Sequence, residues 1–249
     1  MTDVRDAHTA VKPLEGRRAL ITGGTTGIGR AIAVLLASEG ARVFVCGRDP
    51  QHLADALRRI REVGKGDGIA LDLADSDGVA RFLDAGVAWL GGLDIAVANA
   101  AVAAEGLGDM NEGALRYAIA TDFTAYLTFA HAAIPHLGEE GDMVLIGSMS
   151  AHVLGPGSTV YAGIKYGIQG FAEALRRELG PKGVRVALVE PGLTGSDMQT
   201  NSPEKQREKI GAEKSLRAED IAVGVQYLLT QPNRTVVQQL TIAPRAGKE

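Results

Sequence analysis

The stretch that decides the fold runs from Arg18 to Ser38 and reads RALITGGTTGIGRAIAVLLAS. An apolar run over 18–21 ends at a glycine-rich turn, and residues 30–38 have the composition of a helix. A glycine cluster becomes informative in this context of strand, tight turn and helix. Glycines let the backbone approach a pyrophosphate, whose charge is favoured by the free N–H groups and the dipole at a helix start. We therefore predict a dinucleotide-binding turn, the alternative being an ordinary glycine-rich turn.

Apolar runs and helical periodicity alternate along the rest of the chain. Strands are predicted at 18–21, 42–46, 68–71, 93–98, 143–146, 184–189 and 235–242, and helices at 30–38, 50–63, 79–90, 112–137, 160–179 and 219–229. This alternation predicts an α/β fold, a Rossmann-like doubly wound parallel sheet of about seven strands with helices on both faces. Residues 192–215 are polar and lack hydrophobic periodicity, so we predict a substrate loop or lid there, the alternative being a disordered insertion.

Length and composition indicate one domain without a nucleic-acid or membrane partner. The chain has 249 residues, 45% of them hydrophobic, which predicts a single domain over 14–249 after a flexible extension at 1–13. A net charge of −4 offers no basic footprint for nucleic acid. No secretory signal or membrane-spanning run is recognisable, so we expect a cytoplasmic protein. Cys46 is the only cysteine and the histidines are scattered, so no metal site is expected.

Tyr161 and Lys165 are candidates for proton chemistry. They lie four residues apart near the start of a predicted helix, so their side chains share one face. A cation beside a phenol favours the phenolate, which makes the tyrosine a candidate acid/base for an alcohol or a carbonyl. Ser148 closes the preceding strand at the carboxyl edge of the sheet, where its hydroxyl could bond the same substrate oxygen. By itself the pair would more often be a surface pair, and its position beside Ser148 favours the functional interpretation.

Taken together, these motifs resemble the short-chain dehydrogenase/reductase family almost from end to end. The resemblance rests on Gly23, Gly27 and Gly29 in TGxxxGxG spacing, Asp72-Leu73, Asn99-Ala-Ala101, Ser148, Tyr161 with Lys165, and Pro191-Gly192. It implies an NAD(P)-dependent oxidoreductase that interconverts a carbonyl and a secondary alcohol on a small molecule. It further implies that Tyr161 is the acid/base, that Ser148 binds the substrate oxygen and that Lys165 also holds the nicotinamide ribose. Ser150 is set aside because its spacing to Tyr161 differs from the family's.

The resemblance also implies a coenzyme site built from several segments. It assigns to that site Gly23, Thr25, Thr26, Gly27, Ile28, Gly29, Arg48, Asp72, Leu73, Asn99, Tyr161, Lys165, Pro191, Gly192 and Thr194. Asp72 is expected to meet the adenine amino group, although a helix-capping aspartate is an equal alternative. Asn99 is expected to support the coenzyme side and the central sheet, and Thr194 to meet the nicotinamide carboxamide.

The end of the second predicted strand bears on the choice of coenzyme. An NAD-preferring site usually places an acidic side chain there for the ribose 2′-OH, about twenty residues beyond the glycine motif. Here Gly47 stands at that position and Arg48 follows, whereas Asp49-Pro50 has the pattern of a helix N-cap followed by a first-turn proline. Glycine leaves room and arginine supplies a planar cation for a 2′-phosphate. We predict that NADP(H) is preferred over NAD(H), the alternative being a solvated Arg48.

Asp122 is the main departure from the family pattern. Members of the family typically carry an asparagine here, which helps to hold a helix distortion and the water of a proton relay. An ionised aspartate accepts hydrogen bonds but donates none. Asp122 is therefore counted with Ser148, Tyr161 and Lys165 as a candidate catalytic residue. The alternative function is an NADP-binding protein whose catalysis is weak or lost.

The helices that follow the fourth and fifth strands form subunit contacts in the family. In this chain they carry Phe123, Tyr126, Leu127, Phe129, Phe171 and Leu175. These residues offer more apolar surface than one core-facing stripe requires. We therefore predict a homo-oligomer, either a tetramer or a dimer.

Overall fold

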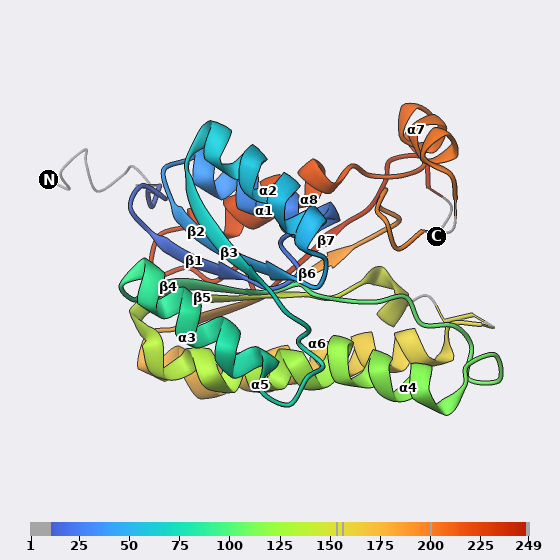
Figure 1. Ribbon diagram of the computed structural model, residues 1–249, viewed down its shortest axis with the longest axis horizontal. Coiled ribbons are helices and arrows are strands. Elements are labelled where there is room, and N and C mark those ends of the chain that lie inside the picture. The colour runs from blue at the N-terminus through green and yellow to red at the C-terminus, as the bar shows by residue number, and fades with distance from the viewer. Residues whose placement is uncertain (1–10, 153, 156, 200, 248–249) are drawn as a thin grey trace, which may run out of the picture.

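The computed structural model describes residues 11–152, 154–155, 157–199 and 201–247. Within these ranges, a seven-stranded parallel sheet is covered by helices on both faces (Figure 1). The strands are β1 (Arg18–Ile21), β2 (Arg42–Gly47), β3 (Lys65–Ala70), β4 (Leu93–Ala98), β5 (Leu137–Ile146), β6 (Arg185–Pro191) and β7 (Gln239–Ile242). The predicted α/β fold is confirmed. Most of the predicted extension at 1–13 lies outside the described residues.

Helices form a layer on each side of the sheet. The α-helices of the described chain are α1 (Gly27–Ser38), α2 (Pro50–Val63), α3 (Gly78–Leu90), α4 (Glu112–Ile119), α5 (Ala125–Ala133), α6 (Thr159–Leu179), α7 (Pro203–Gly211) and α8 (Ala218–Leu229). Figure 1 shows α1, α2 and α8 on one face, and α3, α4, α5 and α6 on the other. None of these helices has the length and apolarity that crossing a bilayer requires.

Two hydrophobic cores result from the alternation of side chains along buried strands. In β1, Leu20 packs among residues of α3, α5 and α6, whereas Ala19 and Ile21 pack with α1 and α8. All three side chains are fully buried. The unbroken apolar strands recognised in the sequence therefore serve both faces of one sheet, as expected for parallel strands covered by helices.

The strand order places a crevice beside the glycine turn. Neighbouring strands follow the order β3-β2-β1-β4-β5-β6-β7, so β1 lies between β2 and β4. The chain extends the sheet in one direction from β1 to β3 and then in the other direction from β4. Ligands of open α/β sheets bind at such a reversal, outside the carboxyl ends of the strands. The Thr22–Gly29 turn and Asn99 follow the two strands that flank this point.

Three strands begin at least three residues away from their predicted starts. β3 begins at Lys65 rather than at 68, because its backbone pairs with β2 from Arg42 onward. β5 begins at Leu137 rather than at 143, and β7 spans only 239–242. In place of an earlier start to β7, the Thr235 N–H bonds back to a carbonyl three residues before it. The hydrophobic pattern of a sequence indicates which residues are buried. The ends of a strand depend instead on backbone hydrogen bonds, which polar residues form as well as apolar ones.

Two helical predictions also need correction. The polar stretch 192–215 is not a continuous loop, because it contains α7. This helix buries no side chain, and its N-cap is Ser202, whose hydroxyl accepts a hydrogen bond from the Lys205 N–H. The predicted helix 112–137 is interrupted by a π-helical turn, η2 (Ala120–Thr124), which separates α4 from α5. Asp122 lies in that turn.

The apolar residues proposed for subunit contacts are largely used within the chain. Tyr126, Phe129 and Leu175 are at most 5% exposed and belong to the core beneath the sheet. The Tyr126 hydroxyl donates to the Ile146 carbonyl oxygen at 3.1 Å. The inference of surplus apolar surface was therefore wrong for these three residues, because they pack into the core within the chain. Oligomerisation stays a prediction supported by the partly buried Phe123, Leu127 and Phe171.

Candidate active site

A cavity of about 1240 Å³ opens at the carboxyl edge of the sheet. Among the residues predicted from the sequence, its walls contain Gly23, Thr25, Thr26, Gly27, Ile28, Arg48, Asp72, Leu73, Asn99, Ser148, Tyr161, Lys165, Pro191, Gly192 and Thr194. Gly29 and Asp122 do not line it and instead stand behind its walls. Residues distant in sequence thus meet in one space large enough for a dinucleotide and a small substrate.

The glycine turn forms a tight cradle at one end of this cavity. Gly23 and Gly27 have φ angles of 63° and 49°, in the left-handed region that favours glycine. A Cβ on Gly29 would lie 2.2 Å from the Gly23 carbonyl oxygen and 2.4 Å from Asn99 Nδ2. Since α1 begins at Gly27, its free N–H groups lie beside this cradle, an arrangement suited to a pyrophosphate.

Asn99 fastens the end of β4 to the glycine turn. Its Nδ2 donates to the carbonyl oxygens of Thr22 and Gly23 at 3.0 and 3.1 Å. The Thr22 hydroxyl accepts in return from the backbone N–H groups of Asn99 and Ala100 at 2.8 and 3.1 Å. Thr22 was not predicted as a site residue, although it begins the glycine motif. Its place before the first glycine is the signal that could have identified it.

The segment after β2 caps the next helix and brings Arg48 to the cavity. Asp49 caps α2, because its side chain accepts from the N–H groups of Gln51 and His52 at 2.7 and 3.0 Å. A Cβ on Gly47 would lie 2.2 Å from Thr25 Oγ1, so the glycine allows the turn to approach β2. Arg48 is left exposed beside the cavity.

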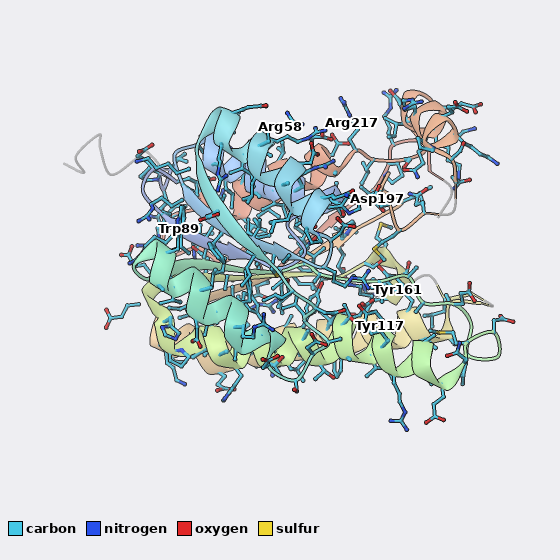
Figure 2. All side chains as sticks on the ribbon, in the orientation of Figure 1. Arg58, Trp89, Tyr117, Tyr161, Asp197 and Arg217 are labelled. Atoms are coloured by element: carbon cyan, nitrogen blue, oxygen red, sulfur yellow. The ribbon has the colours of Figure 1, made fainter. Side chains whose placement is uncertain are left out.

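Arg48 is not a free surface side chain. Its Nη1 donates to the Tyr117 hydroxyl, and its guanidinium lies 5.5 Å from the centre of the Tyr117 ring. The Tyr117 hydroxyl donates to Asp72 Oδ2 at 2.6 Å, while Asp72 Oδ1 accepts from the Ala74 N–H at 2.9 Å. Figure 2 shows Tyr117 and Tyr161 at the same end of the molecule, between the lower helices and the sheet. No sequence motif pointed to Tyr117.

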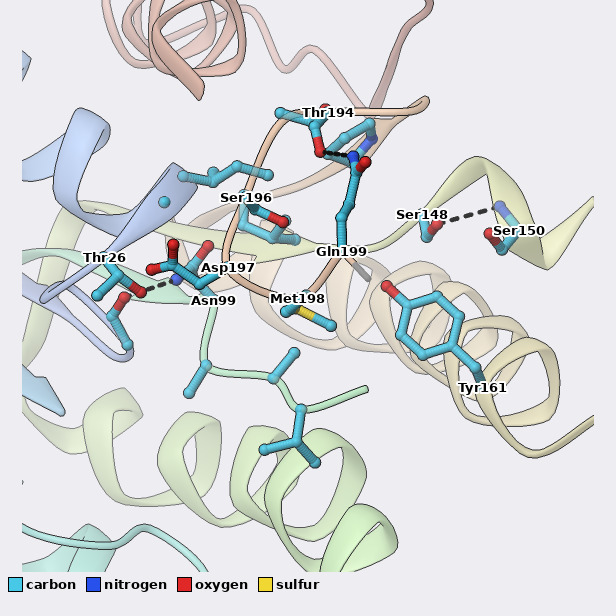
Figure 3. A pocket seen from close by; sticks show the side chains of 18 of the residues that line it. Thr26, Asn99, Ser148, Ser150, Tyr161, Thr194, Ser196, Asp197, Met198 and Gln199 are labelled. Carbon is cyan, nitrogen blue, oxygen red and sulfur yellow. Dashed lines mark hydrogen bonds between the residues drawn. The ribbon is translucent and has the colours of Figure 1, made fainter. Parts of the chain in front are cut away.

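Tyr161 and Lys165 lie together on α6, as their spacing predicted. Lys165 Nζ is 5.5 Å from the centre of the Tyr161 ring and 5.2 Å from that of Tyr126. It also donates to the Ile146 carbonyl oxygen at 3.1 Å. Ser148 stands on the same wall of the cavity, and Figure 3 shows the Tyr161 hydroxyl turned toward the open space beside it.

Lys165 is a buried cation. Its side chain is only 2% exposed. Burial lowers the pKa of its ammonium group, but the neighbouring Tyr126, Tyr161 and Asp122 outweigh burial and raise that pKa above its ordinary value. Lys165 therefore carries a positive charge at neutral pH, beside the Tyr161 ring.

Ser150 supports Ser148 through its backbone. The Ser148 hydroxyl oxygen accepts a hydrogen bond from the Ser150 N–H at 3.1 Å (Figure 3). This contact uses one acceptor site of the hydroxyl, whose proton remains available to a ligand oxygen. Both serines line the cavity. Ser150, which the sequence analysis had set aside because of its spacing to Tyr161, thus orients Ser148.

Asp122 is fully buried in the η2 turn, behind the wall of the cavity. Its Oδ1 accepts from the Val102 N–H at 2.7 Å, whereas Oδ2 has no hydrogen-bond partner among the described residues. Burial raises the pKa of this carboxyl to about 6, against the opposing influence of Lys165 and the Val102 hydrogen bond. The helix distortion expected for the family is present with aspartate in place of asparagine.

The segment after β6 covers the cavity. Figure 3 shows Thr194, Ser196, Asp197 and Met198 on a loop that passes over the space between the glycine turn and Tyr161. The Thr194 hydroxyl donates to the Gly192 carbonyl oxygen at 2.9 Å, which holds the start of this loop. Lining residues also come from α7 and the turn after it, within the predicted substrate loop, and from 243–247, which the sequence analysis had not connected with the site.

Known proteins share this architecture over most of the chain. A short chain dehydrogenase from Burkholderia cenocepacia, solved in complex with NADP, is 31% identical, with a TM-score of 0.84 over 94% of this chain and 98% of that one. A blue fluorescent protein from a metagenomic library, in complex with NADPH, is 25% identical, with a TM-score of 0.83 over 94% and 98% of the two chains. An uncharacterized oxidoreductase of Staphylococcus aureus is 28% identical over 237 residues, which are 93% of this chain and 98% of that protein.

The family model for short chain dehydrogenases matches residues 17–207. This range contains the glycine cradle, the Arg48 segment, the η2 turn and the cavity-lining Tyr161 and Lys165. Sequence, fold and the arrangement of the cavity therefore agree with one another. The chain belongs to the short chain dehydrogenase family of oxidoreductases.

Proposed function

We propose that this protein interconverts a carbonyl and a secondary alcohol on a small molecule and prefers NADP(H) as its coenzyme. The observation that carries the proposal is Tyr161 facing the cavity beside the buried cation Lys165, with Ser148 on the same wall. The bound coenzyme would supply or accept the hydride. The glycine cradle, which a Cβ at Gly29 would obstruct, fits its pyrophosphate.

In the proposed reaction Tyr161 handles the proton. During reduction its hydroxyl donates a proton to the substrate oxygen, and during oxidation the phenolate takes that proton back. The Lys165 charge lies beside the Tyr161 ring, and the Ser148 hydroxyl donates a hydrogen bond to the same substrate oxygen. Lys165 would also hold the nicotinamide ribose, and Thr194 the carboxamide. Asp72 would meet adenine, while Leu73, Ile28, Pro191 and Gly192 would form the walls around the coenzyme.

Turnover with a panel of aldehydes, ketones and secondary alcohols tests this function. Oxidation of NADPH by a carbonyl, or reduction of NADP⁺ by an alcohol, would change the absorbance of the reduced nicotinamide. Tight coenzyme binding without any such change would favour the second candidate, an NADP-binding protein with weak or lost catalysis. That candidate is motivated by the buried Asp122 and its unpaired Oδ2.

Arg48→Ala is expected to weaken the binding of NADP(H) by about 10- to 100-fold and the binding of NAD(H) by less than about threefold. This loss of affinity corresponds to one charge-assisted hydrogen bond to the 2′-phosphate. Dissociation constants for both coenzymes measure it. Arg58→Ala is the matched control, because Arg58 is an exposed arginine of α2 outside the cavity (Figure 2). Equal losses for both coenzymes, or a wild-type preference for NAD(H), would contradict the assignment. NADP and NADPH in two structural neighbours support it.

Asp122→Asn is expected to leave turnover equal or higher and to stabilise the protein in a pH-dependent way. The folded-state pKa of Asp122, about 6, lies above its ordinary value of 3.8, so the protonated form is favoured by folding. Ionisation therefore destabilises the fold progressively as pH rises from about 4 to 6. An asparagine does not ionise, so the variant avoids this loss of folding stability, which the difference between the two pKa values sets at up to about 3 kcal/mol.

Thermal unfolding of both proteins at pH 4 and pH 8 measures the effect. The variant's advantage should be small at pH 4 and reach several degrees at pH 8. A kcat profile should also lose any transition near pH 6 that arises from Asp122. The same advantage at both pH values would show that the carboxyl titrates normally, and complete loss of turnover would show that Asp122 has acquired a necessary role of its own.

Other parts of the proposal concern the protein as a whole. Residues 14–249 would form a single coenzyme-binding and catalytic domain, in which 192–215 acts as the substrate lid. Support comes from the loop over the cavity and from the contact of the following turn with the chain end, where the Ala246 N–H bonds the Glu213 carbonyl oxygen at 2.9 Å. A cytoplasmic homotetramer or homodimer without nucleic-acid or membrane partners would complete the description.

A further inference from the structure

Three side chains from different segments form a connected chain beside the coenzyme cavity. Arg48 follows β2, Asp72 follows β3, and Tyr117 projects from α4. Arg48 and Asp72 line the cavity, whereas Tyr117 lies behind them and is partly buried. Arg48 donates to the Tyr117 hydroxyl, which donates in turn to Asp72 Oδ2 at 2.6 Å.

The Tyr117 hydroxyl is used in both of its capacities. A phenol has one proton to donate, which goes to Asp72, and it accepts the hydrogen bond of Arg48. Burial and the hydrogen bond to Asp72 raise the pKa of Tyr117, so the phenol keeps the proton it donates. The guanidinium has further N–H groups that this contact does not use. These remain available to a ligand in the cavity.

The phenol also separates two opposite charges. Arg48 and Asp72 flank the same hydroxyl, and the Asp72 oxygens are already engaged by Tyr117 and by the Ala74 N–H. Without the hydroxyl, the Arg48 guanidinium and the Asp72 carboxylate would each lose a hydrogen-bond partner, and a direct ion pair between them would replace it. Such a pair would offset the positive charge that a 2′-phosphate requires, since arginine recognises phosphate through charge and a matched fork of donors.

We propose that Tyr117 is a positioning residue that sets the discrimination between NADP(H) and NAD(H). It holds the exposed Arg48 in a single orientation beside the cavity and keeps Asp72 from neutralising it. An otherwise flexible arginine would lose rotamer freedom when it bound the phosphate, and the contact with Tyr117 removes part of that cost beforehand. The inference rests on the proposed NADP(H) preference and extends it to a residue that need not touch the coenzyme.

Tyr117→Phe tests this inference because it keeps the ring beneath Arg48 and removes only the hydroxyl. Titration calorimetry would give dissociation constants for NADP⁺, NAD⁺, 2′,5′-ADP and 5′-AMP. We expect NADP⁺ and 2′,5′-ADP to weaken by about three- to tenfold, with NAD⁺ and 5′-AMP changed less than about twofold. Tyr227→Phe is the control, since Tyr227 is a half-exposed tyrosine of α8 that does not line the cavity.

A double variant separates positioning from packing. If Tyr117 acts through Arg48, Arg48→Ala with Tyr117→Phe should show the same NADP⁺/NAD⁺ ratio as Arg48→Ala alone. Equal weakening of all four ligands by Tyr117→Phe would indicate a packing role and overturn the inference, as would tighter NADP⁺ binding. If the wild type and Arg48→Ala behave as proposed but Tyr117→Phe keeps the wild-type ratio, only this inference fails. If the wild type prefers NAD⁺, the proposed coenzyme preference fails together with it.

Discussion

Tyr161→Phe is expected to lower kcat by about two to four orders of magnitude while leaving the coenzyme dissociation constant nearly unchanged. The aromatic ring remains in place on α6, so the wall of the cavity keeps its shape. The variant loses the hydroxyl that we propose exchanges a proton with the substrate oxygen, beside the Lys165 charge. Steady-state turnover and coenzyme titration measure the two quantities separately.

Tyr166→Phe is the matched control for this experiment. Tyr166 lies on the same helix but is 57% exposed and does not line the cavity. Its variant should keep wild-type turnover. Wild-type kcat in Tyr161→Phe would refute the acid/base assignment, whereas a loss confined to coenzyme affinity would assign Tyr161 to binding rather than to proton transfer.

Gly29→Ala is expected to weaken coenzyme binding by at least about tenfold. It should also destabilise the protein by about 1–3 kcal/mol, the usual range for overpacking. The added methyl group would lie 2.2 Å from the Gly23 carbonyl oxygen and 2.4 Å from Asn99 Nδ2. Neither neighbour is the free end of a flexible side chain, because Asn99 is fixed by its own hydrogen bonds to the turn. The cradle must therefore shift.

Coenzyme titration and thermal unfolding of Gly29→Ala measure both effects. Gly170→Ala is the control, since a Cβ at this exposed position of α6 meets nothing within 4 Å. Alanine is the better helix former, so the control should be neutral or slightly stabilised. Unchanged coenzyme affinity in Gly29→Ala would show that the turn relaxes at little cost and that its close packing does not shape the pyrophosphate site.

Local sequence was sufficient for the parts of this protein that depend on short-range rules. The glycine turn was recognisable because left-handed backbone at Gly23 and Gly27 favours glycine. Helical spacing placed Tyr161 and Lys165 on one face of α6. Asp49 was recognised as the cap of α2, which the structure confirms. Each inference required only the residue types of one contiguous segment.

Polar segments were predicted less well, because hydrophobic periodicity carries no information about them. The helix α7 buries no side chain, so its only local signal was a capping serine followed by proline and glutamate at 202–204. The first residues of β3 were missed for the same reason, since their pairing is between backbones. The core placement of Tyr126 and Phe129 was missed because an apolar side chain does not indicate which partner will cover it.

The sequence by its own pattern thus specified a doubly wound sheet, a tight glycine turn and a tyrosine–lysine pair, since these follow from backbone sterics and helical or strand periodicity. Only the folded chain could join Arg48, Tyr117 and Asp72 beside one cavity, or bury Asp122 until its pKa rises to about 6. Those properties depend on which distant segments meet and on how much water they exclude. Contact and desolvation are set by tertiary packing, and no local pattern encodes them.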